Sequence, residues 1–76
     1  MEDYVIRARK AVAVRIRELR KKHGWSQTDL AERAGIGMRH IQRIETSKIP
    51  PPIKLDTLIR LAHALQIKVN VFLKDF

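Results

Sequence analysis

The chain lacks cysteine and has few of the residues that break helices. Its 76 residues include no cysteine, three glycines and three prolines. Disulfide bonds and thiolate metal sites are therefore excluded. No apolar run approaches the roughly 18 residues of a membrane span, and Met1-Glu2-Asp3 is followed by no secretory signal. We expect a soluble, cytoplasmic protein whose stability comes from side-chain packing.

Acidic residues are scarce relative to basic ones. Eight Asp and Glu stand against sixteen Lys and Arg, which gives a formal net charge of +8 and a sequence pI near 10.7. This charge favours a polyanion or an acidic membrane surface as the partner. A chain of this length forms one domain that buries only about 60% of its unfolded surface, so a second subunit would help to cover its apolar residues.

Apolar residues recur at steps of three and four in two long segments, as in a helix with one buried face. In the segment from Tyr4 to Lys22, which Gly24 ends, they are Val5, Ala8, Val12, Ile16 and Leu19. In the second they are Leu55, Leu58, Ile59, Ala62 and Leu65. Three successive prolines place residues 47–53 in a loop between the segments.

The middle of the chain predicts two short helices joined by the turn Gly35-Ile36-Gly37. Ser26 is followed three residues later by Asp29, which is the pattern of a capped helix start. That helix extends to about residue 34, and Gly35 suits the left-handed conformation that often follows a helix. Its inward residues are Leu30, Ala31 and Ala34, and those of the next helix, about Met38 to Thr46, are Ile41 and Ile44.

The C-terminal segment 67–73 fits two structures. Alternating apolar residues are compatible with a strand, and the spacing of Ile67, Val69, Phe72 and Leu73 is compatible with a short helix. We favour the helix. The fold class is therefore all-α, a compact bundle of about five short helices with a central helix-turn-helix, in which a strand can replace the fifth helix.

The helix at 38–46 is polar on its outward side. Steps of three and four place residues 39, 42, 43 and 46 together. The guanidinium groups of Arg39 and Arg43 fit guanine O6 and N7, and Gln42 fits adenine N6 and N7. A polar helix that follows a shorter one across a sharp turn is the layout of a module that binds the major groove of DNA.

From about Val12 to Leu73 the chain resembles the phage Cro and repressor family of helix-turn-helix proteins. The resembling segments are RIRELRKKHGWSQTDLAERAG, IQRIE and LDTLIRLAHAL. The resemblance implies a bundle of five helices that binds operator DNA as a two-fold dimer, and therefore a transcription regulator. It divides the chain into residues 1–11, an extension of the first helix with three basic residues, and a DNA-binding domain at 12–76.

The resemblance also assigns roles to individual residues. It implies base contacts from Met38, Arg39, Gln42 and Arg43, with Met38 offering apolar contact to a thymine methyl group. It implies DNA-backbone contacts from Gln27, Thr46, Ser47 and Lys48, to which His40 adds a phosphate contact. Arg20 and Glu45 match a structural ion pair. Two departures are Gly37, where a capping hydroxyl residue is frequent, and Gln66, where a glycine is frequent.

Other functions have less support. We expect no enzyme and no cofactor, because no nucleophile, acid or base is spaced for catalysis. We also expect no metal site, because the three histidines lie on separate elements. The alternative that stays open is an antitoxin-type module whose tail pairs, as a strand, with its twin or a toxin. RNA polymerase is a further candidate partner, and a membrane is not expected. For a homodimer, the expected interface is the exposed edge of the helix at 55–65 with the tail at 69–76.

Overall fold

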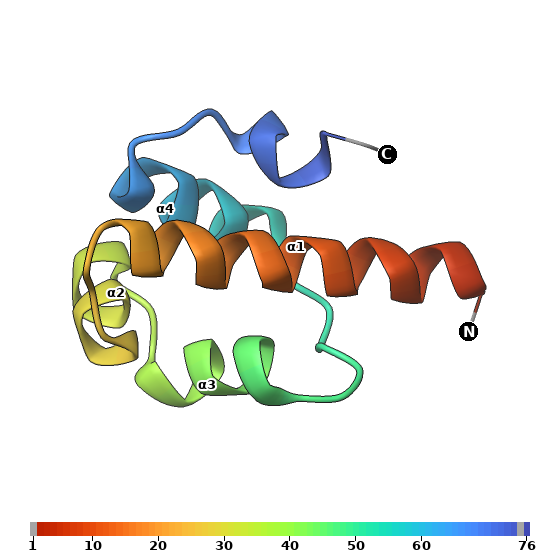
Figure 1. The fold of residues 1–76 in the computed structure, drawn as a ribbon, viewed down its shortest axis with the longest axis horizontal. Coiled ribbons are helices and arrows are strands. Elements are labelled where there is room, and N and C mark those ends of the chain that lie inside the picture. Colours follow the sequence, from red (N-terminus) through yellow and green to blue (C-terminus); the bar gives the residue numbers. More distant parts are fainter. Residues whose placement is uncertain (1, 75) are drawn as a thin grey trace.

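The computed structural model describes residues 2–74 and 76 as helices packed around one core (Figure 1). The elements are α1 (Asp3–Lys22), α2 (Gln27–Ala34), α3 (Met38–Thr46), α4 (Leu55–Leu65) and the 3-10 helix η1 (Val69–Leu73). In Figure 1, α1 runs along the length of the molecule, with α3 on one side of it and α4 and η1 on the other. The described residues contain no strand, and the all-α prediction is confirmed.

The core consists of one apolar cluster to which every helix contributes. It contains Val12, Ala13, Ile16, Leu30, Ala31, Ala34, Ile41, Ile44, Leu61, Ala62, Leu65 and Phe72. The inward residues predicted for α2 and α3 are all in this cluster. The alanines of α2 allow a close approach by its neighbours, because a methyl group occupies little space between helix backbones.

Local interactions determine where α2 begins and ends. The Ser26 hydroxyl accepts a hydrogen bond from the Asp29 amide at 3.0 Å, and the Asp29 carboxylate accepts one from the Ser26 amide at 2.9 Å. This is the predicted capping box. After α2, Gly35 has φ 68°, the left-handed conformation that only glycine adopts without a steric cost. The turn into α3 is therefore encoded locally.

The predicted buried face of α4 requires a correction. Leu55 and Ile59 were expected to face the core, but their side chains are 64% and 49% exposed. Leu61 is fully buried instead, with Ala62 and Leu65. The periodicity allowed both assignments because apolar residues occupy more than half of this helix. The helix turns Leu61 toward the cluster and leaves Leu55 and Ile59 as an apolar edge.

The tail forms a 3-10 helix and not a strand. Phe72 is fully buried, and its carbonyl oxygen accepts a hydrogen bond from the Arg15 guanidinium at 2.7 Å. The tail is thereby attached to α1. The antitoxin alternative expected a strand in the tail, and the described residues contain none.

Candidate nucleic-acid interface

The α2–turn–α3 unit holds α3 against the core by one face only. The Ile36 amide donates to the Ala31 carbonyl at 2.9 Å and closes the turn. On α3, the Ile41 and Ile44 side chains have no exposed surface. Because residues three and four apart lie on the same side of a helix, anchoring these two isoleucines turns residues 39, 42, 43 and 46 outward.

The outward face carries the residues predicted to contact bases. Arg39, Gln42 and Arg43 are exposed, and the Met38 side chain is 41% exposed. Neither guanidinium group has an ion-pair partner among the described residues. Both groups are free to donate two parallel hydrogen bonds to an acceptor pair such as guanine O6 and N7.

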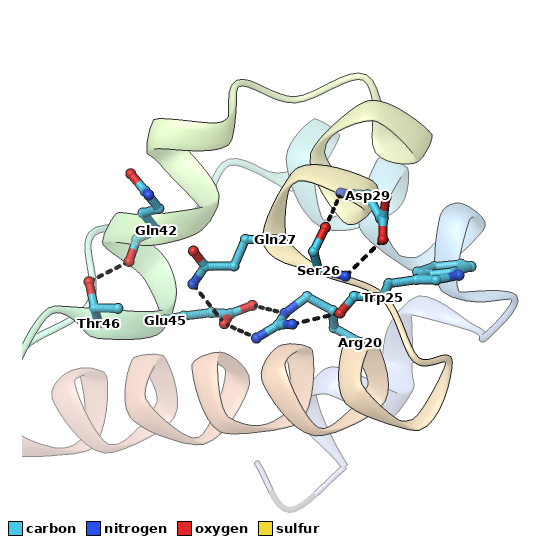
Figure 2. Close-up of polar contacts among 8 residues, drawn as sticks. All are labelled: Arg20, Trp25, Ser26, Gln27, Asp29, Gln42, Glu45 and Thr46. Carbon is cyan, nitrogen blue, oxygen red and sulfur yellow. Dashed lines mark hydrogen bonds and ion pairs between the residues drawn. The ribbon is translucent and has the colours of Figure 1, made fainter.

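A buried ion pair connects the end of α3 to α1, as the resemblance implied. Arg20 Nε and Nη2 each donate to a Glu45 carboxylate oxygen at 2.8 Å, and Arg20 Nη1 donates to the Trp25 carbonyl at 2.7 Å. The two charged side chains are 10% and 1% exposed. Figure 2 shows the guanidinium lying between the carboxylate and the Trp25 carbonyl. Because the planar guanidinium group is hydrogen-bonded on both sides, it fixes the position of α3 relative to α1.

Gln27 completes this network from α2. Its side-chain nitrogen donates to Glu45 Oε1 at 3.1 Å (Figure 2). The position implied to contact the DNA backbone therefore also braces α3. The side-chain nitrogen of Gln27 already donates to Glu45. The other donors at the N-terminus of α2 are its first backbone amides, and a helix N-terminus attracts anions.

The Glu45 carboxyl group is held in its charged form. Burial alone raises the pKa of Glu45, but hydrogen bonds from Arg20 and Gln27 and the charges of Arg20 and Arg17 outweigh burial. The resulting pKa of Glu45 is below its usual value. The same hydrogen bond to Glu45 raises the pKa of Arg20, against the opposing effect of burial. Both groups are therefore charged at neutral pH.

The loop after α3 offers fewer free donors than its sequence suggested. The Thr46 hydroxyl donates to the Gln42 carbonyl at 2.6 Å, and the Ser47 amide donates to the Arg43 carbonyl at 3.2 Å. The Ser47 hydroxyl and the Lys48 ammonium remain as donors for a phosphate. A contact from Thr46 would require its hydroxyl to leave the Gln42 carbonyl.

The start of α3 has no side-chain cap. Gly37 occupies the N-cap, and its carbonyl accepts the amides of His40 and Ile41 at 3.0 and 3.3 Å. The amides of Met38 and Arg39 precede these and have no side-chain acceptor, as the glycine at this position predicted. His40 itself is half-buried.

Sequence reasoning missed Arg17 on α1. This residue is exposed and lines the same cleft as Lys10, Ser47 and Lys48, on the α3–α4 loop side of α1. Its spacing of seven residues from Lys10 was an available signal, because such a spacing places two residues on one helix face. The signal was obscured by the many other basic residues of this helix.

A buried anchor behind an exposed polar helix, after a capped helix and a glycine turn, defines a helix-turn-helix domain. The chain matches the helix-turn-helix family model over residues 16–72, well over half its length. The chain belongs to this family, in its Cro and repressor branch, as the resemblance indicated.

A similar protein is known from Pyrococcus furiosus. The chain is 43% identical over 47 residues to a proposed HTH-type transcriptional regulatory protein of that organism. The alignment covers 62% of this chain but 14% of the relative. The chain thus spans a small part of the length of that protein.

The part of the chain that the structure describes contains neither a membrane-spanning helix nor a cluster of metal ligands. No helix among these residues is long and apolar enough to cross a membrane. No three histidine, aspartate or glutamate side chains within residues 2–74 and 76 lie close enough to bind a metal ion together.

Proposed function

We propose that this domain is a sequence-specific transcription regulator that binds operator DNA as a homodimer, with α3 in the major groove. The observation that carries the proposal is the two-sided character of α3. Ile41 and Ile44 are fully buried, while Arg39, Gln42 and Arg43 are exposed on the opposite side. A helix with this arrangement can enter the major groove with its hydrogen-bond donors facing the bases, while its buried face stays packed on the core.

The exposed side chains suit particular base edges. Arg39 and Arg43 read guanine by bidentate hydrogen bonds, and Gln42 reads adenine. Met38 contacts a thymine methyl group or shields the arginines from water. Each well-placed bidentate pair discriminates against a wrong base by about 1 to 3 kcal/mol.

Contacts with phosphate hold the domain in register on the duplex. Gln27 at the start of α2, His40 in α3, and Ser47 and Lys48 in the loop provide them, with Thr46 contributing if its hydroxyl is released. These contacts neutralise backbone charge and carry no sequence information. Affinity and specificity therefore come from different residues.

Because base contacts and phosphate contacts come from different residues, replacing an arginine of α3 and replacing a lysine of the loop are expected to have different effects on binding. Arg43→Ala is expected to reduce the preference for a selected operator over random duplex by about 1 to 3 kcal/mol, through the loss of one base contact. Lys48→Ala is expected to weaken binding to both duplexes equally and to lower the salt slope by about one. The measurement is binding to both duplexes at several salt concentrations, after selection of bound sequences from random DNA.

The two variants serve as controls for each other. An Arg43→Ala variant that keeps the full preference for the selected duplex would show that α3 does not read bases through this residue. A wild-type domain that binds all duplexes equally would contradict the whole proposal and leave only a basic protein that binds nucleic acid.

Dimerisation is supported by apolar residues that the domain leaves exposed. Leu55 and Ile59 form the exposed edge of α4, and Val69, Val71 and Leu73 are 37 to 42% exposed on the neighbouring tail. The three tail residues lie in the tail segment expected at the interface, whereas Leu55 and Ile59 had been expected in the core. An operator with two half-sites would match the symmetry of a two-fold dimer formed through this surface.

Ile59→Glu is expected to shift the protein from dimer to monomer in sedimentation equilibrium, because it places a charge in an apolar contact. Val14→Glu is the matched control, since Val14 is 54% exposed but lies on α1. Wild-type protein that sediments as a monomer at high concentration would remove the dimer from the proposal.

A further inference from the structure

An open cleft lies between α1 and the loop that follows α3. Its volume is about 330 Å³. It is lined on the α1 side by Lys10, Ala13, Val14 and Arg17, and on the other side by Ile44, Glu45, Ser47, Lys48 and Pro50. We call it the α1 cleft. It adjoins the end of α3, where the loop is proposed to contact phosphate, but two of its basic residues come from α1.

The positive charges of the α1 cleft are not neutralised within the described part of the chain. Lys10, Arg17 and Lys48 are exposed and have no ion-pair partner there. The one acidic residue of the lining, Glu45, has both carboxylate oxygens occupied by Arg20 and accepts a further hydrogen bond from Gln27. The lining therefore contains three exposed cations and one carboxylate that is already paired with Arg20.

The structure separates Lys10 from the other basic residues of the N-terminal extension. Arg7 pairs with Asp3 at 3.4 Å, one helical turn away. Arg9 lines a different, apolar groove with Tyr4 and Leu58. Lys10 shares the cleft with Arg17, and the two residues are seven positions apart, or about 10.5 Å along the helix at 1.5 Å per residue.

We propose that the α1 cleft binds a phosphodiester segment of the DNA backbone, with Lys10 and Arg17 on one side of the strand and Lys48 on the other. A separation of about 10.5 Å corresponds to about three steps of the 3.4 Å axial rise between phosphates of one strand, so the two side chains can contact two different phosphates. The first helix thereby becomes part of the DNA interface. This inference rests on the proposed function and adds a second region of contact to it.

The electrostatics of Glu45 agree with this arrangement. The charge of Arg17 contributes to the lowered pKa of Glu45, and both residues line the cleft. A phosphate entering the cleft meets Arg17 without an intervening free carboxylate. Contact with phosphate through lysine and arginine is independent of base sequence, so α1 would add affinity without specificity.

The test is the salt dependence of duplex binding by a double variant, Lys10→Gln with Arg17→Gln. Glutamine keeps the helix propensity of α1 close to that of the basic residues. Each lost phosphate contact lowers the slope of log K against log salt by about 0.9, so the double variant is expected to lose about 1.8. The ratio of affinities for the selected and the random duplex should not change.

The matched control is Lys22→Gln with Lys68→Gln, which removes the same charge at the other side of α1. Lys22 lines a separate cleft with Leu65 and Ile67, and Lys68 is exposed on the tail beyond it. This variant should keep the wild-type salt slope.

The possible outcomes distinguish the inference about the α1 cleft from the proposed function on which it rests. Loss of slope in the cleft variant alone supports the inference. Equal loss in both variants, or no loss in either, overturns it and leaves the α3 contacts in place. A changed preference between duplexes would place Lys10 or Arg17 against bases and would also overturn it. Failure of the wild type to prefer its selected duplex would instead contradict the proposed function.

Discussion

Replacement of Arg20 by alanine is expected to lower the free energy of unfolding by about 3 to 5 kcal/mol, the usual cost of breaking a buried ion pair from one side. The Glu45 carboxylate is 1% exposed and receives two hydrogen bonds of 2.8 Å from Arg20. Without Arg20 this charge keeps only the Gln27 amide as a hydrogen-bond donor from the network. Chemical denaturation monitored by circular dichroism measures the loss.

A double-mutant cycle separates the cost of leaving one buried charge unpaired from the stabilisation that the ion pair provides. Arg20→Met with Glu45→Leu removes both charges and is expected to cost less than the sum of the two single changes. Lys10→Ala is the control on the same helix, because Lys10 is exposed and should change stability by no more than about 0.5 kcal/mol. Additive single effects would show that the pair does not lock α3 to α1.

The same pair gives the stability a definite pH dependence. Because the pKa of Glu45 is lowered in the folded state, its charged form stabilises the fold above the unfolded pKa of about 4.3. That contribution disappears as the pH falls through the lower, folded-state pKa. The stability difference between the wild type and Glu45→Gln should therefore narrow on acidification, and a constant difference would contradict the assignment.

Phe72→Ala is the second change with a large expected effect, a loss of about 3 to 5 kcal/mol, because it empties the site of a fully buried aromatic ring. Phe72 is the one buried residue of η1, and it joins the cluster formed by α1 and α4. A domain of this size is commonly stable by about 5 to 15 kcal/mol, so the variant loses a large part of its stability. Thermal unfolding at fixed protein concentration is the measurement.

Val71→Ala is the matched control for the tail. Val71 belongs to the same 3-10 helix but is 37% exposed, so the change should be well below that of Phe72→Ala. Similar losses from the two variants would mean that the tail acts through the exposed surface, as in a dimer, and not through the core. Measuring both at two protein concentrations distinguishes these cases.

The helix-turn-helix was predictable because its signals are local. Ser26 and Asp29 cap α2 through groups three residues apart, and Gly35 adopts the left-handed conformation within the turn itself. The spacing of Ile41 and Ile44 likewise determined which side of α3 is buried. Each signal depends on neighbours within about one helical turn, so no knowledge of the rest of the fold was required.

The assignments that failed or stayed open depended on distant neighbours. α4 has apolar residues around most of its circumference, so its periodicity did not distinguish Leu61 from Ile59. The tail fitted both a strand and a helix until Phe72 was seen to enter the core. Positions 38, 39, 42 and 43 were placed on a surface by pattern alone, and their contacts with bases remain predictions.

The sequence by itself determined helices α1 to α4, the turn and the outward face of α3, since all of these follow from residues close together in the chain. The tertiary structure decided which residues of α4 are buried, how the tail packs, and that Arg17 shares a cleft with Lys48. It also showed that the Thr46 hydroxyl is bonded to its own helix. The physical reason is that packing compares surfaces far apart in the sequence, whereas capping and helical periodicity act between residues a few positions apart.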